Sequence, residues 1–273
     1  MSRALDHIII MTRDLQSAAQ TFEELGFYVC PLMRHPFGTA NRLVMFGSSF
    51  IELLGIEEPE KLTSSFAPFQ DYLAGGEGFY GLSLKTDDAE GDRQALLEAG
   101  SGPGPVAGFR RAVALPDGTP TEAVVSTVWA EGLRTPRSAY FLCQQHRPEA
   151  IWVPEWSHHD NGAKDLEEVV LAAPDPEARA RELEGVMGGE AEMAPNGDMV
   201  FTTPLGRLRV TKASPEQKGE IFRSVSVQVQ SIDKARNLLT PSKVDIEADG
   251  DEIVLRPDHC GGTLLRFREK GSS

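Results

Sequence analysis

The chain repeats one pattern of secondary structure four times, and this repeat limits its possible folds more than any other feature. Each repeat begins with a short apolar strand, passes through an acidic capping residue into a helix, and is followed by further short strands. The strand and helix of each repeat fall within residues 5–27, 79–101, 166–189 and 222–244. Four segments with the same order and similar lengths predict four βαβββ units.

The first repeat, LDHIIIMTRDLQSAAQTFEELGF, contains the signals that define both ends of a helix. Asp14 can accept hydrogen bonds from the free N–H groups of the first turn, so it marks the start. Gly26 can adopt the left-handed conformation that ends a helix. Between them, Leu15, Phe22 and Leu25 recur at helical spacing, which predicts a helix with one face packed inward.

A single βαβββ unit leaves its curved sheet open, so two units are expected to pair into a half-barrel that encloses a cavity. We therefore predict an α+β fold of four βαβββ units paired into two half-barrel domains. Residues 1–148 would form the N-terminal domain from units one and two, and residues 166–273 the C-terminal domain from units three and four. Residues 149–165 contain Trp, Pro and Gly, which predicts an ordered connector between the domains.

The composition limits the class of binding partner. The 273 residues include 41 Asp and Glu but only 27 Lys and Arg, which gives a formal net charge of −14 at pH 7. Because this charge repels other polyanions, it argues against nucleic acid or an anionic membrane surface as a partner. We expect the partner to be a small-molecule substrate, and the protein to be a monomer or a homodimer.

The cysteines and the apolar segments predict the compartment. Cys30, Cys143 and Cys260 are far apart and include no C-x-x-C pair, which is typical of a reducing environment. The first apolar run, HIIIM, is short and follows Asp6, unlike a signal peptide. No stretch reaches the roughly 18 apolar residues of a membrane helix. We expect a cytoplasmic protein.

Several motifs stand out in the first two repeats. They are LDHIIIMTRDL at the start of the first unit, FIELLGI at its end, RHPFGTANRL between them, and YFLCQQHRPE followed by HDNGA. The chain resembles the vicinal oxygen chelate superfamily, and these motifs are closest to its glyoxalase-like branch. The resemblance is strongest over residues 5–56 and 140–163 and weakens toward the C-terminus, which implies a degenerate domain in residues 166–273. It does not specify the reaction, because the superfamily includes lyases, epimerases, dioxygenases, thiol transferases and metal-free drug-binding proteins.

The resemblance implies metal ligands on the first and last strands of a unit, facing the cavity. In the first unit these positions are His7 and Glu52. Both interrupt apolar strands, LDHIII and FIELLG, and a buried carboxylate is costly unless a cation compensates it. Histidine and carboxylate together suit Zn²⁺, Mn²⁺, Fe²⁺ or Ni²⁺. The alternative is that Glu52 points to solvent and His7 is a hydrogen-bonded core histidine.

The second unit departs from the family pattern. Its first-strand position is Gly81, which has no side chain, and its last strand, YFLCQQH, has no carboxylate. Strand alternation puts Gln144 and His146 on one face, and either could be a ligand, with His146 chemically the better. His7, Glu52 and His146 would form a two-histidine, one-carboxylate set of the kind found in non-haem iron enzymes.

The segment RHPFGTANRL, residues 34–43, is longer and more polar than a simple hairpin turn requires. We predict that it borders the cavity. His35 is a candidate general acid or base, because the ordinary pKa of histidine lies near neutrality. Asn41 could orient a carbonyl or hydroxyl group, and Arg42 or Arg34 could bind an anionic group. The alternative is a surface loop of turn-forming residues.

Together these residues predict a glyoxalase-like enzyme of lyase or isomerase type, with His35 and Glu52 in catalysis. A divalent metal would bind two neighbouring oxygens of a small substrate and stabilise developing negative charge. Two alternatives remain: a metal-free protein that sequesters a small molecule, which Gly81 favours, and a non-haem iron dioxygenase. The last strands of the third and fourth units offer arginines, so we expect no metal in the C-terminal half.

Overall fold

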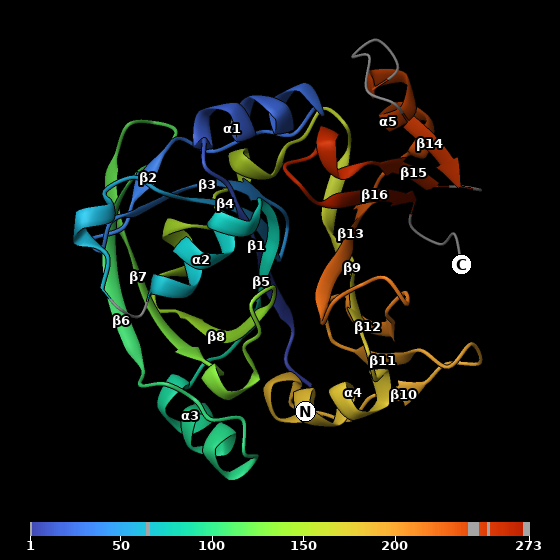
Figure 1. Cartoon of the computed structure of the whole chain (residues 1–273). Coiled ribbons are helices and arrows are strands. Elements are labelled where there is room, and N and C mark those ends of the chain that lie inside the picture. The colour runs from blue at the N-terminus through green and yellow to red at the C-terminus, as the bar shows by residue number, and fades with distance from the viewer. Residues whose placement is uncertain (1, 64–65, 240–245, 250–251, 270–273) are drawn as a thin grey trace.

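The computed structural model describes residues 2–63, 66–239, 246–249 and 252–269. It confirms the predicted α+β fold of four βαβββ units. The strands form two eight-stranded sheets, one from the first two units and one from the last two (Figure 1). The end of the fourth predicted strand–helix segment, at 240–244, lies outside the described residues.

The first sheet contains β1 (Leu5–Met11), β2 (Met33–Arg34), β3 (Thr39–Met45), β4 (Phe50–Ile56), β5 (Gly78–Lys85), β6 (Ala107–Ala114), β7 (Pro120–Trp129) and β8 (Ala139–Gln145). The second contains β9 (Ala163–Ala173), β10 (Glu192–Met193), β11 (Met199–Thr202), β12 (Arg207–Lys212), β13 (Ile221–Val229), β14 (Ile246–Asp249), β15 (Glu252–Leu255) and β16 (Leu264–Glu269). The α-helices are α1 (Leu15–Glu24), α2 (Ala67–Gly75), α3 (Ala89–Glu98), α4 (Pro176–Met187) and α5 (Ile232–Leu239). Short 3₁₀ helices are η1 (Pro59–Lys61), η3 (Glu131–Leu133), η4 (Pro148–Ala150), η5 (Pro154–Ser157) and η7 (Pro257–His259). Within the described part of the chain, no helix has the length and apolar character needed to cross a membrane.

In each sheet the two units meet at their first strands, which run antiparallel. The strand order of the first sheet is β2-β3-β4-β1-β5-β8-β7-β6, and the second sheet repeats it as β10-β11-β12-β9-β13-β16-β15-β14. Within a unit, the last strand returns to lie parallel to the first, as β4 does beside β1 and β8 beside β5. Each sheet therefore consists of two equivalent halves, so that positions in one unit can be matched to positions in another.

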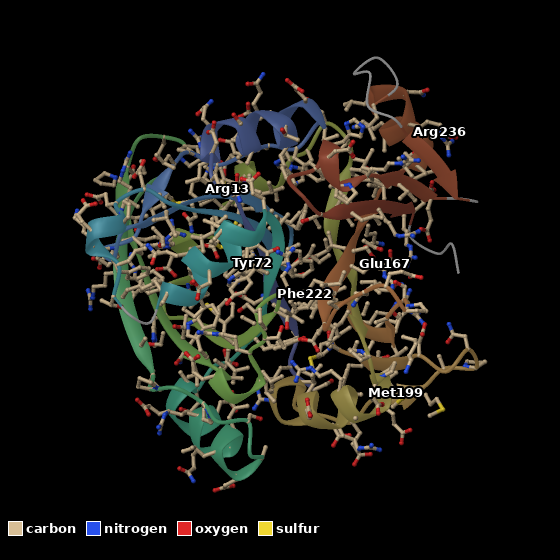
Figure 2. The ribbon with its side chains drawn as sticks, in the orientation of Figure 1. Arg13, Tyr72, Glu167, Met199, Phe222 and Arg236 are labelled. Carbon is tan, nitrogen blue, oxygen red and sulfur yellow. The ribbon has the colours of Figure 1, made fainter. Side chains whose placement is uncertain are left out.

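The largest part of the hydrophobic core lies between the two sheets. Because side chains alternate along a strand, Ile8 and Ile10 of β1 enter this core, and Val169 of β9 belongs to the same cluster. Where the sheets meet, Phe79 of β5 stacks on Phe222 of β13, and their ring centroids are 4.1 Å apart. Phe222 is labelled in Figure 2. The opposite, concave face of the first sheet is therefore left to form a cavity.

Helix α2 was not predicted from the sequence. It lies in the connection between the first two units and packs on the concave side of the first sheet (Figure 1). Phe69, Tyr72 and Leu73 of α2 are buried and share a cluster with Ile9 and Tyr80. Their spacing of three and four residues was the signal that the sequence offered for this helix. The helix adds an apolar wall to the concave face.

The chain between the two sheets is attached to the first sheet through His159. Its Nδ1 accepts a hydrogen bond from the N–H of Tyr28 at 2.9 Å, and its Nε2 donates to the carbonyl oxygen of Met45 at 2.7 Å. Strand β9 begins at Ala163, inside the segment 149–165 that was predicted to be a connector. The boundaries of the two domains stay a prediction.

Burial lowers the pKa of His159 from its ordinary value of 6.5 to about 4. Between these values the folded chain keeps the ring neutral, whereas the unfolded chain takes up a proton, so stability falls as the pH falls. We expect His159 to lower the free energy of unfolding by up to about 1.4 kcal/mol for each pH unit as the pH falls from 6.5 to about 4. Urea unfolding at several pH values measures this slope. His159→Gln, whose amide can make both hydrogen bonds, should have a shallower slope, and an unchanged slope would contradict the assignment.

Candidate active site

A cavity lies on the concave face of the first sheet. Its volume is about 370 Å³, which is within the range of small-molecule sites. Aromatic rings form much of its wall, and polar side chains from several strands reach it. The lining includes the rings of Phe37, Phe50, Phe66, Phe69, Phe109, Trp129 and Phe141, and the polar side chains of His7, His35, Asn41, Glu52, Arg111, Cys143 and Gln145.

His7 reaches the cavity because β1 contains a β-bulge. Strand β1 pairs with β5 through Leu5–Leu84 and then through His7–Ser83, so Asp6 is an extra residue on β1. An extra residue of this kind shifts the alternation of side chains by one position. Leu5 therefore faces the core between the sheets, and His7, two residues later, faces the cavity.

Asp6 and Glu52 contact the two ring nitrogens of His7, and all three side chains are buried. Asp6 Oδ2 lies 2.7 Å from Nδ1, and Glu52 Oε2 lies 3.5 Å from Nε2. An ionised carboxylate can only accept, so Nδ1 holds the hydrogen, and Nε2 of a neutral ring then presents a lone pair toward Glu52. Two lone-pair atoms that face each other repel, and either a proton shared between them or a metal cation removes this repulsion.

Asn41 and His35 continue this polar chain beyond Glu52. Asn41 Nδ2 donates to Glu52 Oε1 at 2.6 Å and lies 3.3 Å from His35 Nε2, while His35 Nδ1 lies 2.7 Å from Thr39 Oγ1. Burial lowers the pKa of His35 to about 3, and the positive charge of Arg111 contributes to the same shift. The ring is therefore neutral at neutral pH, and the argument that its pKa suits a general acid or base is wrong.

Arg34 and Arg42 lie away from the cavity, which corrects their expected role in substrate binding. Arg34 is exposed, and its Nε donates to Glu57 Oε2 at 2.6 Å. Arg42 Nη2 donates to Gln16 Oε1 at 3.1 Å. Successive residues of a strand face opposite sides, so β3 directs Asn41 into the cavity and Arg42 away from it.

Gln144 and His146 also point away from the cavity. The side chain of Gln144 bonds to backbone groups at the start of α3. His146 follows the end of β8, is exposed, and its Nε2 lies 2.8 Å from Ser126 Oγ. The cavity side of β8 belongs instead to Cys143 and Gln145. The structure therefore does not bring His146 or Gln144 to His7 and Glu52, and the non-haem iron alternative loses its second histidine.

The equivalence of the two units explains why the second unit supplies no matching ligands. The parallel registers of β1 with β4 and of β5 with β8 make Gly81 the counterpart of His7, and Phe141 the counterpart of Glu52. A Cβ atom at Gly81 would lie 3.1 Å from Ile9 Cδ1, which leaves little room for a side chain. Phe141 packs edge-on against His7, with ring centroids 5.2 Å apart. The second unit thus forms a wall of the cavity and leaves both ligand positions without a donor.

The donors around His7, including Cys143 from the second unit, fit a divalent cation. The ligand atoms of Asp6, His7 and Cys143 all lie within 4.8 Å of one another, and Glu52 faces His7 from β4. Asn41 Oδ1 is buried without a hydrogen-bond partner among the described residues, so this amide oxygen is available to a ligand. A carboxylate on the far nitrogen of a histidine is a common arrangement at metal sites, where it orients the ring. Imidazole and carboxylate donors suit Zn²⁺, Mn²⁺, Fe²⁺ or Ni²⁺.

The polar residues of this region that were not identified from the sequence include Asp6, Arg111, Cys143 and Gln145. In β6, Arg111 and Val113 are buried while Arg110 is exposed, so alternation along AGFRRAVA was the available signal for Arg111. Cys143 and Gln145 alternate with residues that face away, but the sequence does not say which set faces inward. No local signal marks Asp6, because its position depends on the bulge.

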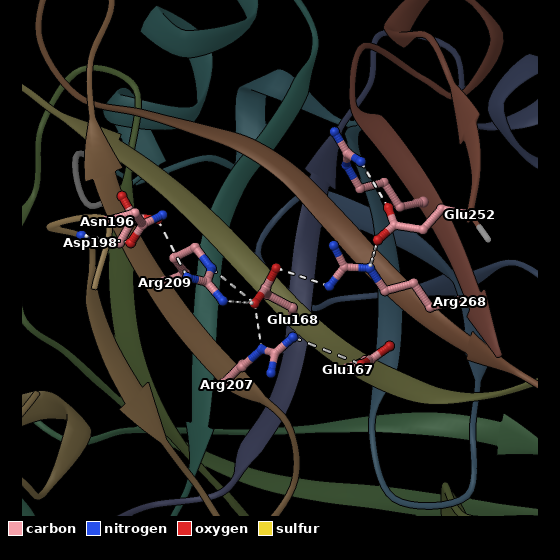
Figure 3. A network of polar contacts seen from close by, with 9 residues as sticks. Glu167, Glu168, Asn196, Asp198, Arg207, Arg209, Glu252 and Arg268 are labelled. Carbon is pink, nitrogen blue, oxygen red and sulfur yellow. Dashed lines mark hydrogen bonds and ion pairs between the residues drawn. The ribbon is translucent and has the colours of Figure 1, made fainter. Parts of the chain in front are cut away.

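The second sheet has an ion-pair network where the first has His7. Glu168 is the counterpart of His7 by the register of β9 with β12. Figure 3 shows Glu168 in contact with Arg207, Arg209 and Arg268, and the nitrogens of Arg209 and Arg268 lie 3.1 Å from its carboxylate oxygens. Burial raises the pKa of Glu168, but the three guanidinium groups outweigh it and lower the pKa overall. Because these groups also repel a cation, the network argues against a metal at this position.

The sequence matches one protein family over most of its length. The family model, described as a glyoxalase-like domain, matches residues 5–187. No curated protein sequence matches the chain significantly.

Solved structures share the fold over almost the whole chain. A hypothetical protein from Staphylococcus aureus has a TM-score of 0.71 at 14% identity and covers 98% of this chain and 100% of its own. A mutant of 4-hydroxymandelate synthase from Streptomyces coelicolor has a TM-score of 0.62 at 11% identity. The match covers 99% of this chain and 93% of the synthase chain. The Mn(II)-bound glyoxalase from Novosphingobium aromaticivorans has a TM-score of 0.58 at 11% identity. The match covers 99% of this chain and 83% of the glyoxalase chain. The family match and the four paired βαβββ units together show that the chain belongs to the glyoxalase-like domain family, with a vicinal oxygen chelate fold.

Proposed function

We propose that the protein is a glyoxalase-like enzyme that holds a divalent metal through His7 and Glu52 and acts on a small oxygenated substrate. The observation that supports this most directly is the facing pair of His7 Nε2 and Glu52 Oε2, 3.5 Å apart in the wall of the cavity. A similar solved structure, titled a Mn(II)-bound glyoxalase, agrees with a divalent metal. A metal bound here would supply Lewis acidity, which stabilises negative charge on a substrate oxygen.

The side chains around the pair have separate roles in this proposal. Glu52 is the group that moves the proton, because it lines the cavity and has a single hydrogen bond, from Asn41. The free Oδ1 of Asn41 accepts a hydrogen bond from a substrate hydroxyl. His35, whose ring is neutral, positions Asn41 and does not itself transfer the proton. A carboxylate base beside a Lewis-acid site favours proton transfer next to a carbonyl, as in a lyase or an isomerase.

Metal analysis by mass spectrometry of the untagged protein tests the proposal. We expect about one transition metal ion per chain in the wild type, and its loss in His7→Ala and Glu52→Ala, because each removes a ligand. Asp6→Asn should keep the site but bind metal about 10- to 100-fold more weakly, since it removes the carboxylate that orients His7. His146→Ala is the matched control, because this exposed histidine lies outside the cavity and its loss should change nothing.

A wild type that takes up none of the four metals, even when each is added in excess, would overturn the metalloenzyme proposal. Loss of metal from His146→Ala but not from His7→Ala would overturn the assignment of ligands. If metal is bound, its identity and the consumption of oxygen separate lyase or isomerase chemistry from dioxygenase chemistry.

The second candidate is a metal-free protein that binds and sequesters a small molecule. Gly81 and Phe141, which stand at two of the four positions equivalent to ligands, favour it, as does the aromatic wall of the cavity. Under this alternative, His7 and Glu52 would form an ion pair with a protonated ring. Tight binding of a small molecule by protein without metal, together with no turnover of it, would favour this alternative.

A further inference from the structure

The cavity contains a guanidinium group that the proposed metal chemistry does not use. Arg111 of β6 is 6% exposed and lines the cavity together with Glu52 and Phe109. It donates to the thioether sulfur of Met33, which is a weak acceptor. Among the described residues, no carboxylate lies within ion-pair distance of this group.

The other buried arginine of the described chain, Arg179, has a carboxylate partner. Arg179, on α4, is 9% exposed, and its Nη2 donates to Glu220 Oε1 at 3.0 Å and to the Leu133 carbonyl oxygen at 2.6 Å. A guanidinium group has five N–H donors, and burying its charge without partners is costly. Arg111 incurs this cost at the wall of a cavity, where a bound ligand could supply the missing acceptors.

The charges of the cavity point to an anionic ligand. Burial lowers the pKa of Arg111, and the carboxylate of Glu52 raises it. A metal cation bound to His7 and Glu52 would neutralise the negative charge of the Glu52 carboxylate, which would then no longer compensate Arg111. Arg134 and Glu131, which also line the cavity, pair with each other at 3.0 Å. With metal bound, the positive charge of Arg111 therefore lacks compensation from the cavity wall.

The apolar part of the cavity is built from aromatic rings. Phe37 stacks on Phe66 with ring centroids 4.6 Å apart, and it meets Phe109 edge-on at 5.3 Å. Trp129 stacks on Phe141 at 4.2 Å. Walls of this kind favour a flat, apolar ligand body, because rings pack well against rings.

We propose that Arg111 is the anion-binding residue of the cavity, and that the ligand has an aromatic or similarly flat body and one carboxylate group. The planar fork of the guanidinium group matches the two oxygens of a carboxylate. The flat body lies against the aromatic rings. This inference rests on the proposed function only in that both use the same cavity, and it defines the substrate class of that site.

Isothermal titration with a matched pair of probes tests the inference. 3-Phenylpropanoate and 3-phenylpropanamide have the same flat body, but only the first has a charged carboxylate. We expect the wild type to bind the acid about 10- to 100-fold more tightly than the amide, since hydrogen bonds to charged groups contribute this much. Arg111→Gln should lose this preference. Arg110→Gln should keep it, because Arg110 is exposed on the same strand and pairs with Glu122.

Folding of the variant is controlled separately. Arg111→Met removes an uncompensated buried charge at similar length, so it should melt no lower than the wild type while it loses the preference for the acid. Equal binding of acid and amide by the wild type would overturn the inference without any variant. Retention of the preference by both Arg111 variants would overturn it as well.

The same titrations on protein as purified and on protein treated with a chelator separate this inference from the proposed function. A preference for the acid that depends on Arg111 and survives chelation supports the anion site even if His7 and Glu52 hold no metal. Metal that depends on His7 and Glu52, without any preference for the acid, overturns the anion site and leaves the metalloenzyme proposal standing.

Discussion

Arg179→Ala is expected to lower the free energy of unfolding by about 3 to 5 kcal/mol, as is typical when one partner of a buried ion pair is removed. The change leaves Glu220, which is 7% exposed, without its counter-charge. Glu220 also accepts hydrogen bonds from Ser138 and from the hydroxyl of Tyr140 at 2.8 Å. The carboxylate of Glu220 therefore connects α4 and β8 to the segment before β13. Urea unfolding at neutral pH measures the loss.

Arg181→Ala is the matched control on the same helix. Arg181 pairs with Glu177 at 2.7 Å, but both side chains are more than half exposed, so its loss should cost about 1 kcal/mol or less. The double variant Arg179→Met with Glu220→Gln removes both charges and should lose less than Arg179→Ala does. Similar losses in Arg179→Ala and Arg181→Ala would show that burial does not set the strength of this contact.

Trp156→Ala is expected to destabilise the fold by about 3 to 5 kcal/mol, the range for removing a buried aromatic side chain. Trp156 is 2% exposed and lies in η5, between the two sheets in the sequence. It shares a cluster with Met45 and Phe50 of the first sheet, and the ring of Phe50 stacks on His7 at 4.2 Å. The loss should therefore leave a cavity behind the candidate site. Chemical denaturation measures it.

Trp152→Ala is the control for this change. Trp152 is only partly buried, and its ring contacts the ammonium group of Lys85 at 4.4 Å. The same chemical substitution should therefore cost clearly less at this position. If Trp152→Ala costs as much as Trp156→Ala, the segment is stabilised by something other than burial of the Trp156 ring.

The repeats were predictable because their signals are local. Three of the acidic caps, Asp14, Asp88 and Asp175, accept hydrogen bonds from N–H groups of the first turns of their helices. Capping and strand alternation act within a few residues, so they can be read from the chain itself. The fourth helix departs from the pattern, because the hydroxyl of Ser231 accepts the hydrogen bond from Lys234 there at 3.3 Å. The helix α2 was missed although its apolar spacing was visible.

The candidate site was only partly predictable. The resemblance placed His7 and Glu52 on the first and last strands of a unit, and the structure brings them together, with Asn41 hydrogen-bonded to Glu52. The ligand expected from the second unit, His146, lies beyond the end of β8, is exposed and is outside the cavity. The sequence predicted it on the same face as Gln144, but alternation alone does not say which face of a strand looks inward.

The sequence by itself therefore determined the four units, their order and the pair His7 and Glu52. Only the tertiary structure decided which side chains meet in the cavity. The bulge at Asp6 turns His7 inward, and the register of β5 with β8 leaves Gly81 and Phe141 at the positions where further ligands would lie. Bulges and registers depend on pairing between strands far apart in the chain, so no local pattern specifies them. Arg111, by contrast, lies in the hairpin of β6 with β7, where it pairs with Ala123, and its inward position follows the local alternation of β6.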